Sequence, residues 1–380
     1  MKNIKHIIAI IFIFSLFSLC SREQSAPVSP HLIKIKPEQK QLVSADNNMG
    51  YDIYKNLWNL KNQNSNILIS PISLNKPISI ILFGTNNNYE VRKVLQFPNL
   101  KKEAIYTEIN QLNNTIFNID EHSEFKNITR FLTHKQNNIT NEFKKFIRKN
   151  KIIKIDYYNS DNSSQISNNI SKTSLFNIEN EISLKCNFKY QTGKTESPFY
   201  TSPDLSKFVE MLICKSEFNF YSDDIIKAIE MPLGRGNYNA LIILPESNQS
   251  LQNIKNKLNK HYINRINSKF RKLNLSVYVP QLDIKYNYSL NKSMNECSIH
   301  KLFSTKANKF KNISTNKDLY LNKLSQSATI KTVSKPIESK KLFENEIKNS
   351  FFIDHPFLLI ITEKYSGSIL FIGQIINPVK

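Results

Sequence analysis

The order in which hydrophobic patterns follow one another along the chain limits its architecture more than any single motif does. Residues 47–61 place apolar side chains at helical spacing, and residues 78–84 form the nearly continuous apolar stretch of a buried helix. Strand-like patterns come later, over residues 273–280, 357–362 and 369–376. Helices thus precede antiparallel strands without regular alternation, and this order predicts an α+β fold rather than a doubly wound parallel sheet.

Two local signals add detail to this pattern. Ser70 is of a residue type that caps helices, and Pro71 suits the first turn that would follow it. Farther along, residues 229–232 and 240–245 flank the turn-like sequence Gly-Arg-Gly-Asn at 234–237, as the two arms of a hairpin would. These signals predict a helix starting near residue 70 and an antiparallel pair in the second half.

The first twenty residues have the pattern of an export signal. Lys2 and Lys5 form a basic start, and the apolar run Ile7–Leu19 is too short for a comfortable membrane span and ends at Cys20. These features predict a signal peptide over residues 1–19, with Cys20 lipidated as in bacterial lipoproteins. Leu19 departs from the small residue that such cleavage sites prefer, so ordinary secretion and a retained anchor stay open. We expect a protein outside the cytoplasm, either secreted or tethered to a membrane by an N-terminal lipid at the cell surface.

The segment after this signal is expected to be a tether. Residues 20–44 are rich in Pro, Ser, Gln and Lys, and such a composition buries too little apolar area to fold alone. Residues 45–380 are then expected to form one domain.

The chain lacks the short motifs of common enzyme sites. Only 7 of its 380 residues are glycine, and no Gly-rich phosphate loop, nucleophile elbow or zinc-protease motif is present. A triad assembled from distant residues would leave no such motif, yet nothing in the sequence indicates one. The four cysteines, at positions 20, 186, 214 and 297, include no closely spaced pair. We expect a protein that is not an enzyme and has no cofactor, metal site or catalytic residue.

A net charge of +21, from 52 basic and 31 acidic residues, suggests polyanionic partners such as a sulfated polysaccharide or an anionic membrane surface. Diffuse surplus charge is the alternative, and no specific nucleic acid is indicated. One candidate is a basic amphipathic helix over residues 143–154, and another is the stretch 255–272. The basic residues of the first candidate are Lys144, Lys145, Arg148, Lys149 and Lys151. We expect a monomer.

Several segments, taken together, carry a family resemblance. They are Ser70-Pro71-Ile72-Ser73 with Leu82-Phe83-Gly84, Phe143 to Asp156, Gly193 to Phe199, Glu230-Met231-Pro232 through Leu244-Pro245, Asp354-His355-Pro356-Phe357-Leu358, and Leu370-Phe371-Ile372-Gly373 with Asn377-Pro378. In this order and at these distances they resemble the serpins, a family of serine protease inhibitors. The resemblance covers residues 45–380.

The resemblance implies a fold, a mechanism and a partner. The fold would hold three mostly antiparallel β-sheets, eight or nine helices and a mobile reactive-centre loop. Family inhibitors offer this loop as bait: a serine or cysteine protease cleaves it and becomes acylated. The loop then inserts as a new central strand of the main sheet and deforms the trapped enzyme.

The hinge of that loop departs from the family's usual residues. Aligning residues 319–322 with the strand that enters the loop places the hinge at Ser334, Pro336 and Ile337, where inhibitors typically carry Glu, Gly and Thr. Pro336 has no N–H and a fixed φ, so it fits a central strand poorly. Alternation from Ile337 turns Lys341 inward, at a cost of roughly several kcal/mol. These residues predict impaired insertion and inefficient covalent trapping.

The resemblance also suggests where the loop is cut and where the sheet opens. Counting forward from the hinge and back from residue 356 gives a scissile window of Asn345, Glu346, Ile347, Lys348, Asn349 and Ser350. The sheet-opening region would contain Ser70, Ser73 and Gln326, with Gln326 in place of the usual His. The tryptophan that the family carries near Thr192 is missing, since the only Trp is Trp58.

The sequence leaves two functions open. One is protease inhibition through the loop. The other is a non-inhibitory serpin fold that serves as a binding module and recognises a polyanion or a host protein through its basic surface.

Overall fold

A computed structural model describes residues 29–379 except 61–63, 86–99, 151–153, 158–173, 248, 292–309, 317 and 335–348. The chain divides into two compact units, Met1–Pro30 and His31–Lys380, and the elements below belong to the second. The expected signal peptide and Cys20 lie outside the described residues. In the part of the chain that is described, no helix is both long and apolar enough to cross a membrane.

The first helix, α2, spans Pro37–Leu60 and begins ten residues before the expected start at Asn47. Pro37 occupies the first turn, where its missing N–H costs nothing, and the Lys36 N–H donates to Gln39 Oε1 over 3.0 Å. Leu42 and Val43 on this added stretch are buried. The prediction that the tether runs through residue 44 is therefore wrong for residues 37–44, because their apolar side chains pack into the domain.

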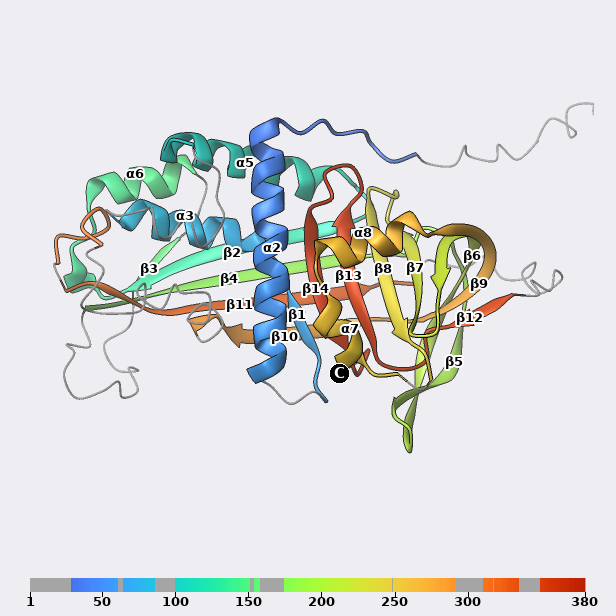
Figure 1. The fold of residues 1–380 in the computed structure, drawn as a ribbon. Helices are drawn as coiled ribbons and strands as arrows, with labels where there is room; N and C mark the ends of the chain where they lie inside the picture. The colour runs from blue at the N-terminus through green and yellow to red at the C-terminus, as the bar shows by residue number, and fades with distance from the viewer. Residues whose placement is uncertain are drawn as a thin grey trace, which may run out of the picture. The chain divides into compact units, whose positions relative to one another are not determined.

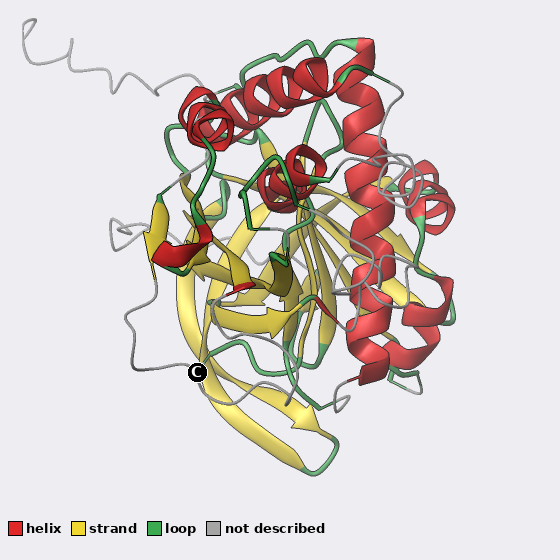
Figure 2. Ribbon diagram, turned by 90° about the vertical axis from the view of Figure 1, so that its left-hand side faces the viewer, coloured by secondary structure: helices red, strands yellow, loops and turns green. Residues whose placement is uncertain are grey.

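The remaining described helices flank the sheets. Near the N-terminus, a 3-10 turn, Ile72–Leu74, leads directly into α3 (Asn75–Gly84), and the apolar α3 is buried as predicted. Figure 1 shows α3, α5 and α6 above one end of the sheet that contains β2 and β4, and Figure 2 shows the helices along the outside of the strands. The other helices are α5 (Lys102–Asn118), α6 (Asn141–Lys149), α7 (Leu251–Lys257) and α8 (Lys260–Ser268).

A five-stranded sheet contains the strands that matter most for the resemblance. Its order is β10 (Asp283–Ser289), β11 (Tyr320–Thr332), β4 (Leu175–Cys186), β2 (Glu124–Thr133) and β3 (Ile155–Tyr157). The pairs β10–β11 and β4–β2 are antiparallel, whereas β11–β4 and β2–β3 are parallel. The two long central strands, β11 and β4, therefore lie side by side and run in the same direction (Figure 1).

The second sheet has nine strands. The order along its main path is β1 (Ile67–Ile69), β14 (Ile369–Ile375), β13 (Phe357–Glu363), β8 (Tyr238–Pro245), β7 (Ile226–Leu233), β6 (Leu205–Ser222), β9 (Arg271–Pro280) and β12 (Ser350–Phe352), and β5 (Gln191–Ser202) pairs with β6. In the described part of the chain, hydrogen bonds thus join the strands into two sheets rather than the three sheets expected. The reason is the long β6, which pairs with β5 and β9 and, through residues 219–222, with β7.

The hairpin predicted from residues 229–232 and 240–245 is confirmed. Strands β7 and β8 are joined by a turn in which Gly234 and Gly236 have φ of 56° and 104°, a region that favours glycine. Strands β13 and β14 form the C-terminal hairpin. Gly373 of β14 packs so closely on β1 that a Cβ there would lie 2.0 Å from the carbonyl oxygen of Ile67.

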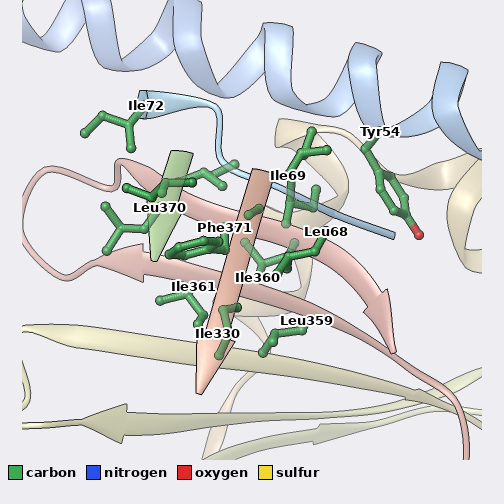
Figure 3. Close-up of a cluster of buried hydrophobic side chains, with 14 of the residues drawn as sticks. Tyr54, Leu68, Ile69, Ile72, Ile330, Leu359, Ile360, Ile361, Leu370 and Phe371 are labelled. Atoms are coloured by element: carbon green, nitrogen blue, oxygen red, sulfur yellow. The ribbon is translucent and has the colours of Figure 1, made fainter. Parts of the chain in front are cut away.

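The hydrophobic core joins both sheets to α2. Figure 3 shows Tyr54 from α2, Leu68 from β1, Phe371 from β14 and Ile330 from β11 in one cluster. All four side chains are at most 1% exposed. This core fixes the five-stranded sheet against the first residues of the 3-10 turn, which is where the candidate site lies.

Candidate functional site

The seam between β4 and β11 is the first feature of the site. These strands pair directly in parallel register, from Leu175 opposite Tyr320 to Cys186 opposite Thr332, with one irregularity between Leu321 and Lys323. No other strand lies between them along this length. In the serpin resemblance this is the position at which a reactive loop would insert.

A buried polar cluster lies beneath the middle of this seam. We call it the seam cluster, and its members are Ser70, Ser73, Asn180, Tyr288 and Gln326. Asn180 on β4 and Gln326 on β11 are register partners, and the Gln326 Nε2 donates to Asn180 Oδ1 over 2.9 Å. A side-chain hydrogen bond therefore crosses the seam in addition to the backbone ladder.

The amide of Gln326 also binds the segment that leads into the 3-10 turn. Its Oε1 accepts from the Ser70 N–H at 2.8 Å, and its Nε2 donates to the Ser70 carbonyl at 3.0 Å. This is the pattern by which one strand pairs with another, made here by a side chain. The same Nε2 lies 2.7 Å from Ser73 Oγ, so one amide holds β11 to both serines.

The other members complete the network across the sheet. The Tyr288 hydroxyl on β10 donates to Gln326 Oε1, and burial, with a smaller contribution from Tyr286, raises the pKa of Tyr288 so that it stays a neutral donor. Ser73 Oγ is 2.7 Å from Asn180 Oδ1, and the Asn180 amide nitrogen donates to Thr129 Oγ1 on β2 at 3.1 Å. Because these groups are buried, opening the seam would cost roughly 1–3 kcal/mol for each one left without a partner.

The sequence predicts part of this cluster. The serpin resemblance groups Ser70, Ser73 and Gln326 in one region, and the structure brings all three together. The prediction that the Ser70 side chain caps the helix is wrong, since the 3-10 turn has no side-chain cap and the Ser70 backbone bonds to Gln326 instead. Asn180 was missed, although it is the one polar residue among the inward-facing positions 176, 178, 180, 182 and 184 of β4.

The segment that leads into the expected reactive-centre loop begins where β11 ends. The Val333 N–H donates to the carbonyl oxygen of Cys186 at 2.8 Å, which extends the pairing with β4 by one residue. Ser334, the first predicted hinge residue, is half-buried, and its Oγ accepts from Gln191 Nε2 on β5 at 2.9 Å. The other hinge residues, Pro336 and Ile337, lie outside the described residues.

The segment that follows the expected reactive-centre loop contains β12. Asn349 and Ser350 are exposed, and the Ser276 N–H on β9 donates to the Asn349 carbonyl at 3.0 Å. Ser350 begins β12 and pairs with Ser276 in parallel register. The rest of the scissile window, Asn345, Glu346, Ile347 and Lys348, lies outside the described residues.

An ion pair follows β12. The His355 Nδ1 lies 2.8 Å from Asp354 Oδ1, and its Nε2 lies 3.0 Å from the carbonyl oxygen of Pro245. Burial alone would lower the pKa of His355, but the hydrogen bonds with Asp354 and Pro245 outweigh burial, and the pKa is raised. Since neither oxygen can donate while Asp354 is ionised, both ring nitrogens carry protons in this arrangement.

The basic helix predicted over residues 143–154 corresponds to α6, which is shorter at its C-terminal end. Thr140 caps it by accepting from the Phe143 N–H at 3.1 Å, and Phe143, Phe146 and Ile147 are buried. Four of the five predicted cations are exposed and have no ion pair among the described residues; Lys151 lies outside them. The four are Lys144, Lys145, Arg148 and Lys149.

Metal and thiol chemistry receive no support from the part of the chain that is described. No three His, Cys, Asp or Glu side chains within it are placed to hold a metal ion. Cys186 and Cys214 are buried and form no disulfide with each other, and burial, aided by the charge of Asp120, raises the pKa of Cys186 to about 12.

Comparison with known proteins identifies the arrangement. The family model described as Serpin (serine protease inhibitor) matches residues 44–378. Curated relatives include Serpin H1 of Gallus gallus, 21% identical over 96% of this chain and 97% of its own length, and leukocyte elastase inhibitor of Sus scrofa, 23% identical over 89% and 100%.

Solved structures share the fold. Native protease nexin-1 with heparin superposes with a TM-score of 0.77 at 19% identity, and human thyroxine-binding globulin complexed with thyroxine superposes with a TM-score of 0.76 at 17% identity. Each match covers 90% of this chain and 100% of the other chain. The expected fold class is thereby confirmed.

Proposed function

The chain belongs to the serpin family, and from this premise we propose that it inhibits a serine or cysteine endopeptidase through the segment between β11 and β12. Membership places it among inhibitors and binding proteins rather than among enzymes. Its relatives include a protein named for elastase inhibition, which supports a protease as the partner. The observation that carries the proposal is the direct parallel pairing of β4 and β11, because it leaves a seam that one further strand can occupy.

The proposed inhibition follows from the two strands that flank the loop, β11 and β12. After a protease cuts the chain between them, the piece that remains joined to β11 at Thr332 can turn back and enter the seam. The backbone groups that β4 and β11 release can then pair with the N–H and C=O groups of the entering strand. We place the cut before Asn349, because Asn349 and Ser350 are already hydrogen-bonded to or paired with β9.

Two features oppose entry into the seam. The hydrogen bond between Gln326 and Asn180 must break as the strands part. The entering strand would also carry Pro336, which cannot donate to the ladder, and would turn Lys341 toward the core. We therefore propose that the protein partitions toward cleavage, with only a minority of encounters ending in a trapped protease.

The test is incubation of the full chain with a panel of serine and cysteine proteases, followed by denaturing electrophoresis. A covalent complex that survives SDS, together with a cleaved form cut between residues 345 and 349, supports inhibition. Cleavage without any complex across the panel removes the trapping mechanism. Heating the protein before and after nicking decides separately whether the loop enters the seam, since an added strand raises the melting temperature.

The second candidate is recognition of a polyanion, and the exposed basic face of α6 favours it. Four exposed cations on one short helix, unpaired within the described residues, attract sulfated sugars more than scattered charges do. The solved structure of protease nexin-1 with heparin supports this proposal for a protein of the same fold. A host protein with an acidic surface is the other partner of this kind.

A matched pair of variants tests the second candidate. One replaces Lys144, Lys145, Arg148 and Lys149 by Gln, and the other replaces four cations of the competing stretch, Lys257, Lys260, Arg265 and Lys269. If α6 is the site, only the first variant elutes from heparin at lower salt. Equal small losses would indicate diffuse attraction, and elution of the parent chain at modest salt would remove the proposal.

We further propose that the protein acts outside the cytoplasm, secreted or held at the cell surface by a lipid on Cys20. The support is the apolar run Ile7–Leu19 behind a basic start. Mass analysis of the mature N-terminus distinguishes a lipidated Cys20 from simple secretion and from a retained anchor.

A further inference from the structure

A cavity of about 570 Å³ opens where α2 ends and α7 begins, away from the seam. The residues that line it are Trp58 near the end of α2, Asn64, residues 200–203 at the end of β5, residues 245–247 and 249–252 around the start of α7, residues 354–356 before β13, and Ile376. Its volume lies within the range of small-molecule sites, roughly 300–1,000 Å³.

The cavity walls are mainly apolar. The apolar side chains are Trp58, Tyr200, Pro203, Pro245, Leu251, Pro356 and Ile376. The Trp58 indole N–H donates to Gln252 Oε1 at 2.9 Å, which satisfies its single donor and fixes the ring. Prolines and a fixed indole have few conformations to lose, so little conformational entropy is lost when a ligand binds here.

The charged groups in the walls are already paired. Asp354 is bonded to His355, whose two ring nitrogens are both engaged. Glu246 Oε2 binds the ammonium of Lys227 at 3.0 Å. The lining contains no Lys or Arg. An ionic ligand would therefore leave water without meeting an unpaired opposite charge, whereas an uncharged one would avoid that cost.

We propose that this cavity is a binding site for an uncharged, largely apolar small molecule with aromatic or fused rings. The proposal concerns a site that is separate from the loop and does not depend on protease inhibition. It commits to a neutral occupant because the lining combines apolar walls with charges that are mutually compensated.

The chain carries its own reporter for this site, because Trp58 is its only tryptophan. The full chain is titrated with phenylnaphthylamine, a neutral fused-ring probe whose absorption overlaps indole emission. Its sulfonated analogue, anilinonaphthalene sulfonate, has the same ring body with one negative charge. We expect saturable quenching of Trp58 by the neutral probe, with a Kd at least about tenfold lower than that of the sulfonate.

Two variants locate the bound probe. Ser247→Phe adds a ring at an exposed position in this cavity, and Asn264→Phe adds the same ring at an exposed position in a different cavity of about 430 Å³ beside α8. Ser247→Phe should weaken binding of the neutral probe at least about tenfold, and Asn264→Phe should leave it unchanged. Because both positions are exposed, both variants should keep the melting temperature of the parent chain.

Several results would overturn the proposal. They are the absence of saturable quenching, a sulfonate that binds as tightly as the neutral probe, and a loss of binding in Asn264→Phe rather than in Ser247→Phe. Inhibition of proteases is unaffected by any of these outcomes, so the two proposals fail separately.

Discussion

The side chain of Gln326 on β11 reaches Asn180 on β4 over 2.9 Å, so a hydrogen bond between two buried amides spans the one parallel seam in the centre of the five-stranded sheet. This bond must break before any strand can enter the sheet there. We therefore expect the seam cluster to affect both the stability of the uncut protein and the strand insertion proposed above.

The first prediction concerns this bond. Gln326→Ala should lower the melting temperature of the uncut chain, because it removes partners of Ser70 and Asn180, each worth about 1–3 kcal/mol when left unsatisfied. It should also speed the formation of oligomers on mild heating, measured by native electrophoresis. The control is Ser325→Ala, at the residue that directly precedes Gln326 on the same strand, and it should change neither property. An unchanged melting temperature for Gln326→Ala would contradict the stabilising role of the cluster.

The second prediction concerns the hinge. The double variant Pro336→Gly with Lys341→Ala should raise the fraction of SDS-stable complex with any protease that cuts the loop, because it restores a backbone donor and removes a buried cation. Lys340→Ala, on the outward-facing register, serves as the matched control. The ratio of complex to cleaved product on a denaturing gel gives the result. If the double variant and the control give the same ratio, the hinge residues do not limit insertion.

The third prediction concerns a buried acid between α2 and α3. Asp46 is fully buried, its Oδ2 accepts from Asn75 at 2.8 Å, and burial raises its pKa well above the usual value despite that bond. In the unfolded chain this carboxyl group ionises near pH 4, whereas in the folded chain it keeps its proton to higher pH. The free energy of unfolding therefore falls as pH rises above about 4. Asp46→Asn should therefore be more stable than the parent at pH 7, with the difference shrinking toward pH 4.

Urea unfolding at several pH values measures this difference. The same substitution at the exposed Asp204 serves as the matched control. A parent chain that is more stable than Asp46→Asn at pH 7 would mean that the buried carboxylate is ionised and stabilising, contrary to the prediction.

The fourth prediction concerns His355. Its pKa is raised in the folded chain, so the stability it contributes is complete below the unfolded pKa of about 6.5 and disappears as pH rises through the folded value. His355→Gln should thus lose more stability, relative to the parent, at pH 6 than at pH 8.5. His261→Gln, at an exposed position on α8, is the control. A loss that is equal at both pH values would show that His355 acts through packing alone.

The fifth prediction concerns Gly373. A Cβ at this position would lie 2.0 Å from the carbonyl oxygen of Ile67, so Gly373→Ala must push β1 away from β14. We expect a loss of at least ~3 kcal/mol in the free energy of unfolding. Gly367→Ala meets open space and bears only the cost of a left-handed φ, ~1–2 kcal/mol. Thermal unfolding of the two variants should show the larger shift for Gly373→Ala.

The sequence predicts those parts of the fold whose signals are local. The C-terminal hairpin could be identified because two apolar runs flank Gly367, and the β7–β8 hairpin because its turn needs two glycines with positive φ. Helix α5 was overlooked, although Ile105, Ile109 and Leu112 repeat at helical spacing and are buried. The start of α2 was misplaced because a proline-rich stretch hid the buried Leu42 and Val43.

Long-range pairing was less accessible from sequence. The resemblance grouped Ser70, Ser73 and Gln326, but Tyr288 and Asn180 join them only through the order of β10, β11 and β4. That order depends on a parallel contact between strands more than 140 residues apart, which no local pattern encodes. The joining of two expected sheets through β6 likewise depends on how one long strand pairs with both β7 and β9.

The composition of the seam cluster also determines which signals the protein can respond to. Its members are two amides, two alcohols and a phenol whose pKa is raised, so none of them changes charge near neutral pH. A change in pH alters the free energy of unfolding through Asp46 and His355. It does not alter the side-chain hydrogen bonds between β4 and β11. Under the proposed function, the pairing of β4 and β11 therefore changes on cleavage of the chain and not on protonation.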